Sequence, residues 1–268
     1  MPSLMLCYAR SGGTILNKCL ACLPNVVMLS EVNALGGGWG KEGKDSSTTP
    51  YQQMQEWYGA NHGMEGLDFS EQLDLVENDC WLQDNHFIVR DWTTVDFTKH
   101  RYNNNNPSFK LNTYNTMLDL FGENLKTFAF VRDSIDVWIS RGCPDIDEFY
   151  FSYNSYLNYL LLLQKEDKIQ IFKYEEFCGT PKTILTEITN YLGINCEPYI
   201  INKVVDEDWM YYTKVNGDTQ NSYPATDYRS KCISPLSRKP IGRVNVDRIN
   251  NSKHMILCNN ALGYEINY

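Results

Sequence analysis

The chain has 268 residues, of which 43% are hydrophobic and 13% aromatic, so it can bury a large core and is not a wholly disordered protein. Its formal net charge of −9 argues against a general nucleic-acid coat and a polybasic membrane binder, although it leaves room for a local basic patch. No apolar run approaches the roughly 18 residues of a membrane helix, and the apolar start of the chain lacks the basic region of a signal peptide, so we expect a cytoplasmic protein without a membrane partner.

Predicted strands and helices alternate along the chain. Short apolar runs predict strands at residues 3–8, 26–29, 86–90, 126–131 and 168–174. Helical spacing of apolar residues predicts helices at residues 14–23, 114–121, 134–141, 145–165 and 180–192. This alternation favours an α/β fold in which helices cover a parallel sheet, within a single domain that spans residues 1–268.

Three stretches are expected to be connections. Residues 36–49 are rich in glycine and polar side chains, which is typical of a loop or lid, and the four asparagines at 103–106 predict an exposed connection. Residues 210–241 lack clear periodicity and are expected to contain a long functional loop. Cys19 and Cys22 form a lone C-x-x-C pair without further ligands at metal spacing, so we expect helix packing there and no metal.

A glycine-containing turn follows the first predicted strand and precedes a predicted helix. It reads Ala-Arg10-Ser11-Gly12-Gly13-Thr14. Glycines let backbone N–H groups approach an anion, and the helix start adds free donors and a favourable dipole. The turn resembles a P-loop, but it lacks the lysine of the G-x-x-x-x-G-K-[ST] pattern. Taken alone, this turn is weak evidence for a phosphate site, because an ordinary strand-to-helix turn has the same residues.

A second polar segment has the same setting. Arg132 follows the apolar run at 126–131, and Ser140 lies two turns into the helix that comes next. Ligands of parallel α/β sheets gather at the carboxyl ends of the strands. The two segments are therefore expected to bind two separated phosphates of one nucleotide.

Together these segments resemble the signature of PAPS-dependent sulfotransferases, of the bacterial small-molecule type. PAPS is 3′-phosphoadenosine-5′-phosphosulfate. A third match is the run Phe-Lys-Tyr-Glu-Glu-Phe at 172–177, followed by Pro181 and by Leu-Gly at 192–193. The three segments occur in the order and spacing of that family and span about residues 3 to 195.

The resemblance implies a P-loop-like fold and the transfer of a sulfuryl group from PAPS to a small molecule, with 3′,5′-ADP as the product. It implies in-line displacement onto a hydroxyl, an amine or a carbamoyl nitrogen. Arg132 and Ser140 would contact the 3′-phosphate, and Arg10 would stabilise charge on the transferring group. The family's 5′-phosphosulfate loop corresponds to Arg10, Ser11, Gly12, Gly13, Thr14 and Ile15, with arginine in place of the lysine that many members carry.

The C-terminal part of the chain is basic. Arg238 and Lys239 match part of the family's Arg-Lys-Gly segment, and the resemblance therefore makes them candidate cofactor-binding residues. Residues 227–253 hold seven basic and two acidic residues, in contrast to the acidic chain as a whole. The excess suits a polyanionic cofactor, and the alternative is a solvated basic face.

A general base must lie within hydrogen-bond reach of the acceptor proton. Glu31, after the second predicted strand, is the first candidate, and it resembles the catalytic glutamate that several Golgi-type sulfotransferases place there. Asp91 and His86, at the two ends of the next strand, are the further candidates. The alternative for Glu31 is a loop residue that caps or pairs locally.

The acceptor is expected from charge. Residues 45–89 contain nine acids and no lysine or arginine, together with four tyrosines and tryptophans. Such a region could close over a cationic acceptor, through carboxylates and cation–π contacts, or it could be a solvated acidic helix face. The composition, rich in asparagine and tyrosine, and the compact length resemble those of a bacterial natural-product tailoring enzyme. A sulfotransferase that acts on a guanidinium alkaloid such as saxitoxin would fit the first interpretation.

Two other classes of function stay open at this stage. A P-loop small-molecule kinase would need Mg²⁺ and a phosphate-binding lysine, which the first turn lacks. A non-catalytic nucleotide-binding module would keep both phosphate-binding segments and tolerate the loss of the candidate base.

Overall fold

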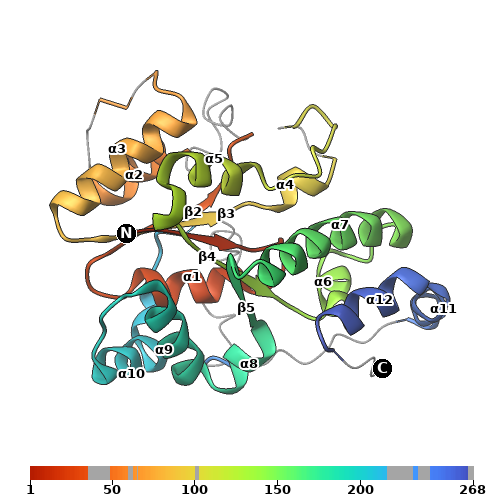
Figure 1. Ribbon diagram of the computed structural model, residues 1–268. Helices are drawn as coiled ribbons and strands as arrows, with labels where there is room; N and C mark the ends of the chain where they lie inside the picture. Colours follow the sequence, from red (N-terminus) through yellow and green to blue (C-terminus); the bar gives the residue numbers. More distant parts are fainter. Residues whose placement is uncertain are drawn as a thin grey trace.

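A computed structural model describes residues 1–35, 49–59, 63–64, 66–99, 103–215, 232–234 and 242–264. Its centre is a five-stranded parallel sheet in the order β2-β3-β1-β4-β5 (Figure 1). The strands are β1 (Pro2–Leu6), β2 (Val26–Val32), β3 (His86–Asp91), β4 (Lys126–Val131) and β5 (Ile169–Lys173). The predicted α/β fold with a helix-covered parallel sheet is confirmed.

Helices cover both faces of the sheet, because successive side chains of a strand point to opposite sides and both sides are apolar here. Leu4 and Leu6 of β1 face one core, whereas Met5 and Cys7 face the other. The first core is packed mainly by α3 (Phe69–Leu82), α5 (Asn112–Phe121), α7 (Ile146–Lys165) and α12 (Lys253–Ala261). The second is packed by α1 (Gly13–Ala21), α8 (Tyr174–Gly179), α9 (Pro181–Leu192) and α10 (Pro198–Asp206).

Shorter elements complete the described part of the chain. They are α2 (Pro50–Tyr58), α4 (Thr94–Phe97), the 3₁₀ turns η3 (Gly122–Asn124) and η4 (Asp208–Tyr211), α6 (Ser134–Ser140) and α11 (Arg243–Asn251). Local signals set several helix ends. Asp68 and Glu71 form a capping box at the start of α3, and α9 runs from Pro181 to a left-handed Gly193. None of the described helices is both long and apolar enough to cross a membrane.

The edge strand β2 is closed by side chains of α2. The Gln53 amide accepts from the backbone N–H of Ser30 at 2.7 Å and donates to its carbonyl at 2.7 Å. The Tyr58 hydroxyl does the same for Met28, with both distances at 3.0 Å. Two side chains therefore satisfy backbone groups that an open sheet edge would expose.

The structure departs from the sequence predictions in several places. Helices α2, α4, α8, α10, α11 and α12 are additional, and none of them is longer than nine residues, so each offers few apolar positions from which to predict it. The prediction of an exposed connection at 103–106 is wrong for Asn103, which is buried and donates to the carbonyls of Val95 and Thr98. Of the proposed long connections, residues 36–48, 216–231 and 235–241 lie outside the described part.

Candidate functional site

The carboxyl ends of the parallel strands bring the candidate residues to one edge of the sheet. Arg10 follows β1, Glu31 lies near the end of β2, and Arg132 directly follows β4. Because β1 lies between β3 and β4, the turn that begins at Tyr8 is flanked by the segments of two neighbouring strands. This is the edge at which parallel α/β sheets bind their ligands.

The first turn requires both of its glycines. Gly12 has φ +84°, and a Cβ atom there would overlap the ring of Tyr174. Gly13 has ordinary φ, but a Cβ atom would overlap the Cys7 thiol and lie 3.1 Å from Nε of Arg90. Only glycine fits at these positions, because neighbouring side chains fill the space that a Cβ atom would take.

The start of α1 has donors available for an anion. Gly12 is the N-cap residue, and no side chain caps the helix. Ser11 is buried, and its Oγ has no hydrogen-bond partner among the described residues. Thr14 and Ile15, in the first helical turn, are half-buried. An uncapped helix start beside an unpartnered hydroxyl is a fitting site for a phosphate or sulfate group.

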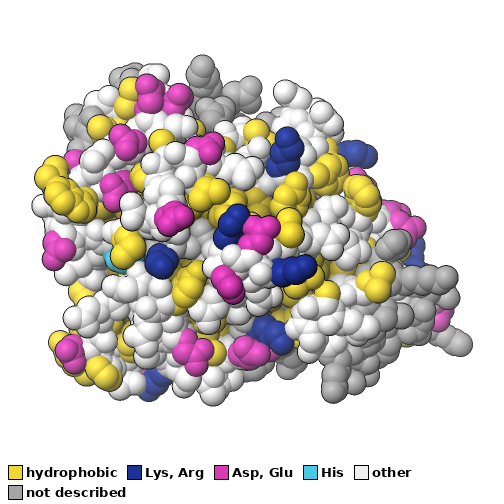
Figure 2. Space-filling view, in the orientation of Figure 1, with side chains coloured by type: hydrophobic (Ala, Val, Ile, Leu, Met, Phe, Trp, Pro, Cys, Tyr) yellow, Lys and Arg dark blue, Asp and Glu magenta, His cyan; other side chains and the backbone are white. Residues whose placement is uncertain are grey.

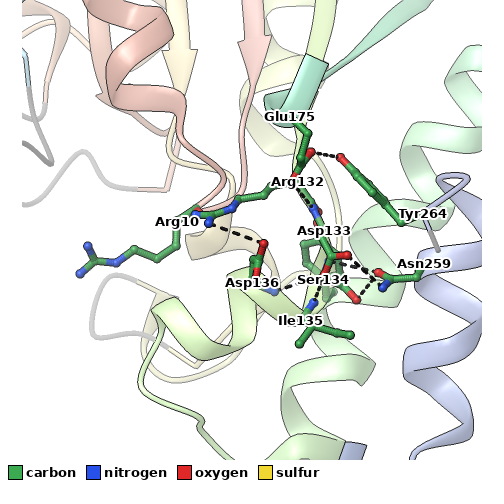
Figure 3. Close-up of polar contacts among 10 residues, drawn as sticks. Arg10, Arg132, Asp133, Ser134, Ile135, Asp136, Glu175, Asn259 and Tyr264 are labelled. Carbon is green, nitrogen blue, oxygen red and sulfur yellow. Dashed lines mark hydrogen bonds and ion pairs between the residues drawn. The ribbon is translucent and has the colours of Figure 1, made fainter. Parts of the chain in front are cut away.

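Arg132 joins the second segment to this turn. Its Nη1 donates to the carbonyl of Arg10 at 3.4 Å, and Nη2 lies 3.8 Å from the Asp136 carboxylate. The guanidinium stacks 4.6 Å from the ring centre of Tyr174. Its Nε is buried and has no partner within the described part of the chain. Figure 3 shows that the Arg10 side chain points away from this cluster, and it is exposed.

The start of α6 differs from the start of α1 because protein groups already occupy it. Asp133 accepts from the N–H groups of Ile135 and Asp136. Asn259 of α12 accepts from the N–H of Ser134 at 3.1 Å and from its hydroxyl at 2.6 Å (Figure 3). An anion at this segment would therefore bind the Arg132 side chain rather than the helix terminus.

The third motif supports the second. Glu175, which follows Tyr174 at the end of β5, accepts from the N–H of Asp133 at 3.2 Å. Its other oxygen accepts from the Tyr264 hydroxyl at 2.6 Å (Figure 3). Burial raises the pKa of Glu175. The segment that resembles the family signature thus holds the Arg132 segment in place.

Other predicted cofactor residues are less well connected. Ser140 is the last residue of α6 and is half-buried. Arg238 and Lys239 lie outside the described residues. Arg248, on α11, is exposed and is part of the predicted basic region.

Glu31 lies in an unusual backbone position. Its φ is +54°, at a register shift between Ser30 and Val32 where β2 pairs with β3. Its Oε1 accepts from Nη2 of Arg90 at 2.7 Å, and the side chains of Glu31 and Arg90 are 18% and 5% exposed. The bulge therefore turns the carboxylate toward a buried cation and leaves Oε2 without a partner among the described contacts.

Asp91 is fully buried at the end of β3. It accepts from Nδ2 of Asn33 at 3.1 Å and from the Thr113 hydroxyl at 2.7 Å. Burial raises its pKa, and burial together with the Asp91 charge raises the pKa of the neighbouring Asp96. The Thr113 oxygen also accepts from the N–H of Ala34. Asp91 thus anchors the chain that follows Glu31.

His86, the third candidate base, begins β3 at the opposite end of the strand from Asp91. Burial lowers its pKa to about 4. Its ring lies 3.5 Å from the Ser3 hydroxyl, so the structure separates it from the turns at the carboxyl edge.

A pocket of about 690 Å³ lies beside Tyr8, the residue that leads from β1 into the first turn. It lies between α4 with its following loop and the α6–α7 connection. Aromatic and charged side chains line it, and none of the described acidic residues of 45–89 is among them. Four of the nine acids of that stretch lie on α3, whose exposed side carries Glu71 and Asp74.

Three functional residues were not singled out from the sequence. Arg90 directly follows the three apolar residues at the middle of β3, which is a usable signal because a buried arginine needs a partner. Asn259 and Tyr264 come from the C-terminal segment, which has weak periodicity, and no local signal points to their contacts.

Comparison with known proteins identifies the fold. No protein family model and no curated protein matches the chain. Among solved structures, a sulfotransferase domain from the curacin biosynthetic pathway superposes with a TM-score of 0.57 at 14% identity, over 100% of this chain and 99% of that one. The sulfotransferase domain of the Synechococcus PCC 7002 olefin synthase gives a TM-score of 0.57 at 16% identity, over 100% and 96%. The chain therefore shares the fold of these domains.

Proposed function

We propose that the chain is a sulfotransferase that moves a sulfuryl group from PAPS to a hydroxyl or an amine of a small molecule. The observation that carries the proposal is a pair of anion-binding positions at one sheet edge, each with a buried donor that lacks a partner within the described part. These donors are Ser11 Oγ at the uncapped start of α1 and Arg132 Nε after β4. The shared fold supports the same reading.

The residues present fit PAPS. Its 5′-phosphosulfate suits the first turn, where the uncapped start of α1 and Ser11 Oγ offer hydrogen-bond donors. Its 3′-phosphate suits Arg132, whose guanidinium is oriented by the Arg10 carbonyl and the Tyr174 ring. Ser140 lies at the other end of α6, the helix that begins two residues after Arg132. When bound, PAPS supplies an electrophilic sulfuryl group whose leaving group is 3′,5′-ADP.

The acceptor must lose a proton as it attacks. We assign this proton to Glu31, whose Oε1 is held by Arg90 while Oε2 remains available. Asp91 acts as a positioning residue, because its bonds to Asn33 and Thr113 fix the chain after Glu31. The exposed Arg10 guanidinium would stabilise charge on the sulfuryl group.

The test is calorimetric binding of 3′,5′-ADP and of ATP with Mg²⁺ to the wild-type chain, Arg132→Ala and Ser140→Ala. We expect 3′,5′-ADP to bind tightly and both variants to weaken it, with Arg132→Ala costing about tenfold or more because it removes a charged hydrogen-bond donor. A preference for ATP with Mg²⁺ would point to a kinase instead. Binding without sulfation of any acceptor would point to a nucleotide-binding module.

The acceptor's charge is a separate matter. The acidic stretch at 45–89 is the argument from the sequence for a cationic acceptor, but none of its described acids lines the pocket beside Tyr8, so a cationic acceptor is the alternative to be tested. Glu71→Gln with Asp74→Asn should then raise the KM of a guanidinium acceptor and leave that of PAPS unchanged. Equal changes in both constants would refute it.

A further inference from the structure

The pocket beside Tyr8 has a strongly aromatic lining. Its volume, about 690 Å³, lies within the range of roughly 300–1,000 Å³ that small-molecule sites occupy. Figure 2 shows hydrophobic side chains gathering on the surface where α7 faces α4. The aromatic residues that line it are Tyr8, Phe97, Phe109, Phe149 and Phe151.

These rings favour a flat, apolar ligand. Phe109 contacts Phe97 and Phe151 edge to face, with ring centres 6.3 Å and 5.3 Å apart. Phe151 is nevertheless 64% exposed, so a large apolar side chain of the pocket is left uncovered. An aromatic ring is the group that would cover it with favourable edge-to-face geometry.

Most charged groups of the pocket already have partners. Lys99 lies 3.5 Å from the Glu148 carboxylate, and both side chains are exposed at the rim. Asp145 caps α7, because its Oδ1 accepts from the N–H groups of Asp147 and Glu148. These three charges are therefore balanced by one another or by a helix terminus.

Arg141 is different. Its guanidinium lies 5.4 Å from the ring centre of Tyr8, whose hydroxyl is fixed by Ser152 at 2.9 Å. The residue is half-buried, and within the described part of the chain no carboxylate lies at ion-pair distance from it. It is a planar cation with donors available to a ligand, placed at an aromatic wall.

The pocket is distinct from the residues that the proposed function gives to PAPS. The described residues 10–15, Arg132 and Ser140 do not line it. Tyr8 does line it and continues directly into the first turn, so the pocket adjoins the position of the sulfuryl group. This is the place of an acceptor rather than of the nucleotide.

We propose that this pocket binds an aromatic hydroxy acid, with its ring among the aromatic side chains and its carboxylate on Arg141. The inference rests on the proposed function for the reaction and names the acceptor class. The phenolic oxygen would form a bond to sulfur while the bond from sulfur to the 5′-phosphate oxygen breaks. The electron pair stays on 3′,5′-ADP, and the phenolic proton passes to the general base.

The test uses three phenols that share a ring and a two-carbon chain. They are 3-(4-hydroxyphenyl)propanoate, its neutral amide and the cationic tyramine. With PAPS, we expect kcat/KM for the carboxylate to exceed both others by about tenfold to a hundredfold, as a charged hydrogen bond allows. Calorimetric binding of the three phenols to the chain saturated with 3′,5′-ADP should give the same order, independently of turnover.

Variants of Arg141 locate the effect. Arg141→Gln should lower kcat/KM for the carboxylate to that of the amide and leave the amide and the affinity for 3′,5′-ADP unchanged. Arg141→Glu should reverse the preference, so that tyramine becomes the best substrate. Arg141→Lys should keep part of the preference for the carboxylate. Lys165→Gln is the matched control, because it removes a positive charge at the last residue of α7, a helix about 30 Å long whose first turns line the pocket.

Several outcomes would overturn the inference. If the wild-type chain has equal kcat/KM and equal affinity for the three phenols, the inference about the acceptor is refuted and the proposed function is unaffected. A wild-type preference for tyramine would favour the cationic acceptor instead. If Arg141→Gln lowers the affinity for 3′,5′-ADP as much as the affinity for the carboxylate, the pocket binds the cofactor and not the acceptor. Failure to bind 3′,5′-ADP at all would refute the proposed function, and carboxylate binding to the chain alone would still test the pocket.

Discussion

Glu31 combines a costly backbone with a buried ion pair. A glutamate at φ +54° is less stable than in the ordinary regions by about 1–2 kcal/mol, and such strain concentrates at functional positions. The compensating contact is the 2.7 Å bond to Arg90, which lies in a largely buried environment. The strained turn of β2 thus aims a carboxylate at the edge where the first turn lies.

We predict that Glu31→Gln lowers kcat by about 10²–10⁴-fold, because it removes the base and keeps a hydrogen-bond acceptor for Arg90. The affinity for 3′,5′-ADP should not change. Steady-state kinetics and calorimetry measure the two quantities, and Glu56→Gln on the exposed side of α2 is the control. Full kcat in Glu31→Gln would remove Glu31 from the reaction.

Gly12 shows how sterics and conformation can be separated. It has φ +84° and closely faces Tyr174, whereas Gly66 has φ +85° with open space around it. Both positions therefore carry the same conformational cost for alanine, and Gly12 alone adds an overlap.

We predict that Gly66→Ala costs about 1–2 kcal/mol of unfolding free energy, and that Gly12→Ala costs more and weakens 3′,5′-ADP binding by at least about tenfold. Urea unfolding and calorimetry provide the two measurements. Equal effects of the two substitutions on both measurements would show that the Tyr174 contact places no constraint on the turn.

At the scale of elements, two helix starts at the same sheet edge have opposite roles. The start of α1 is uncapped, whereas Asp133 and Asn259 cap the start of α6. The cap on α6 comes partly from α12, 125 residues away in the chain. Helix α12 is therefore a brace for the Arg132 segment, in addition to a cover for the core.

We predict that Asn259→Ala lowers the unfolding free energy by about 1–3 kcal/mol, because the N–H and hydroxyl of Ser134 lose their buried acceptor. The substitution should also lower the affinity for 3′,5′-ADP, because the segment that bears Arg132 becomes less well fixed. Asn260→Ala, at the exposed neighbouring position, should change the unfolding free energy by less than about 0.5 kcal/mol. Unchanged 3′,5′-ADP affinity in a destabilised Asn259→Ala would limit α12 to a structural role.

Helix α2 acts on β2 in a comparable way. Gln53 and Tyr58 take the positions that a sixth strand would occupy, and Gln53 bonds to the residue directly before Glu31. The helix therefore closes the sheet edge and supports the bulge that orients the candidate base.

At the scale of the whole molecule, two buried acids and a buried histidine have opposite effects on how the stability of the fold changes with pH. The pKa values of Asp91 and Asp96 are raised in the folded chain, so the folded state holds protons that the unfolded state has lost, and stability falls as pH rises. His86 has its pKa lowered to about 4, so its contribution to stability is lost as pH falls below about 6.5.

We predict that the unfolding free energy falls between pH 7 and 8, where His86 is neutral in the folded state and mostly neutral in the unfolded state, so that the raised pKa of Asp96 dominates. The limit for one proton is about 1.4 kcal/mol per pH unit. Urea unfolding across this range measures the unfolding free energy. Asp96→Asn should make that free energy less dependent on pH, even if the variant is more or less stable than the wild type. A wild-type unfolding free energy that stays constant or rises with pH over this range would contradict a raised pKa of Asp96 in the folded chain.

The parallel α/β sheet, the two turns at its carboxyl edge and the position of Glu31 near the carboxyl end of the second strand could be predicted from the sequence. These features rest on local signals, since apolar periodicity, glycine spacing and strand ends are read within about ten residues. The tertiary structure decided the partners: Arg90 for Glu31, Asn259 for Ser134, Gln53 for the edge of β2 and the aromatic pocket around Arg141. Buried polar groups and cavities are completed by residues from distant elements, and the folding of the chain alone brings those residues together.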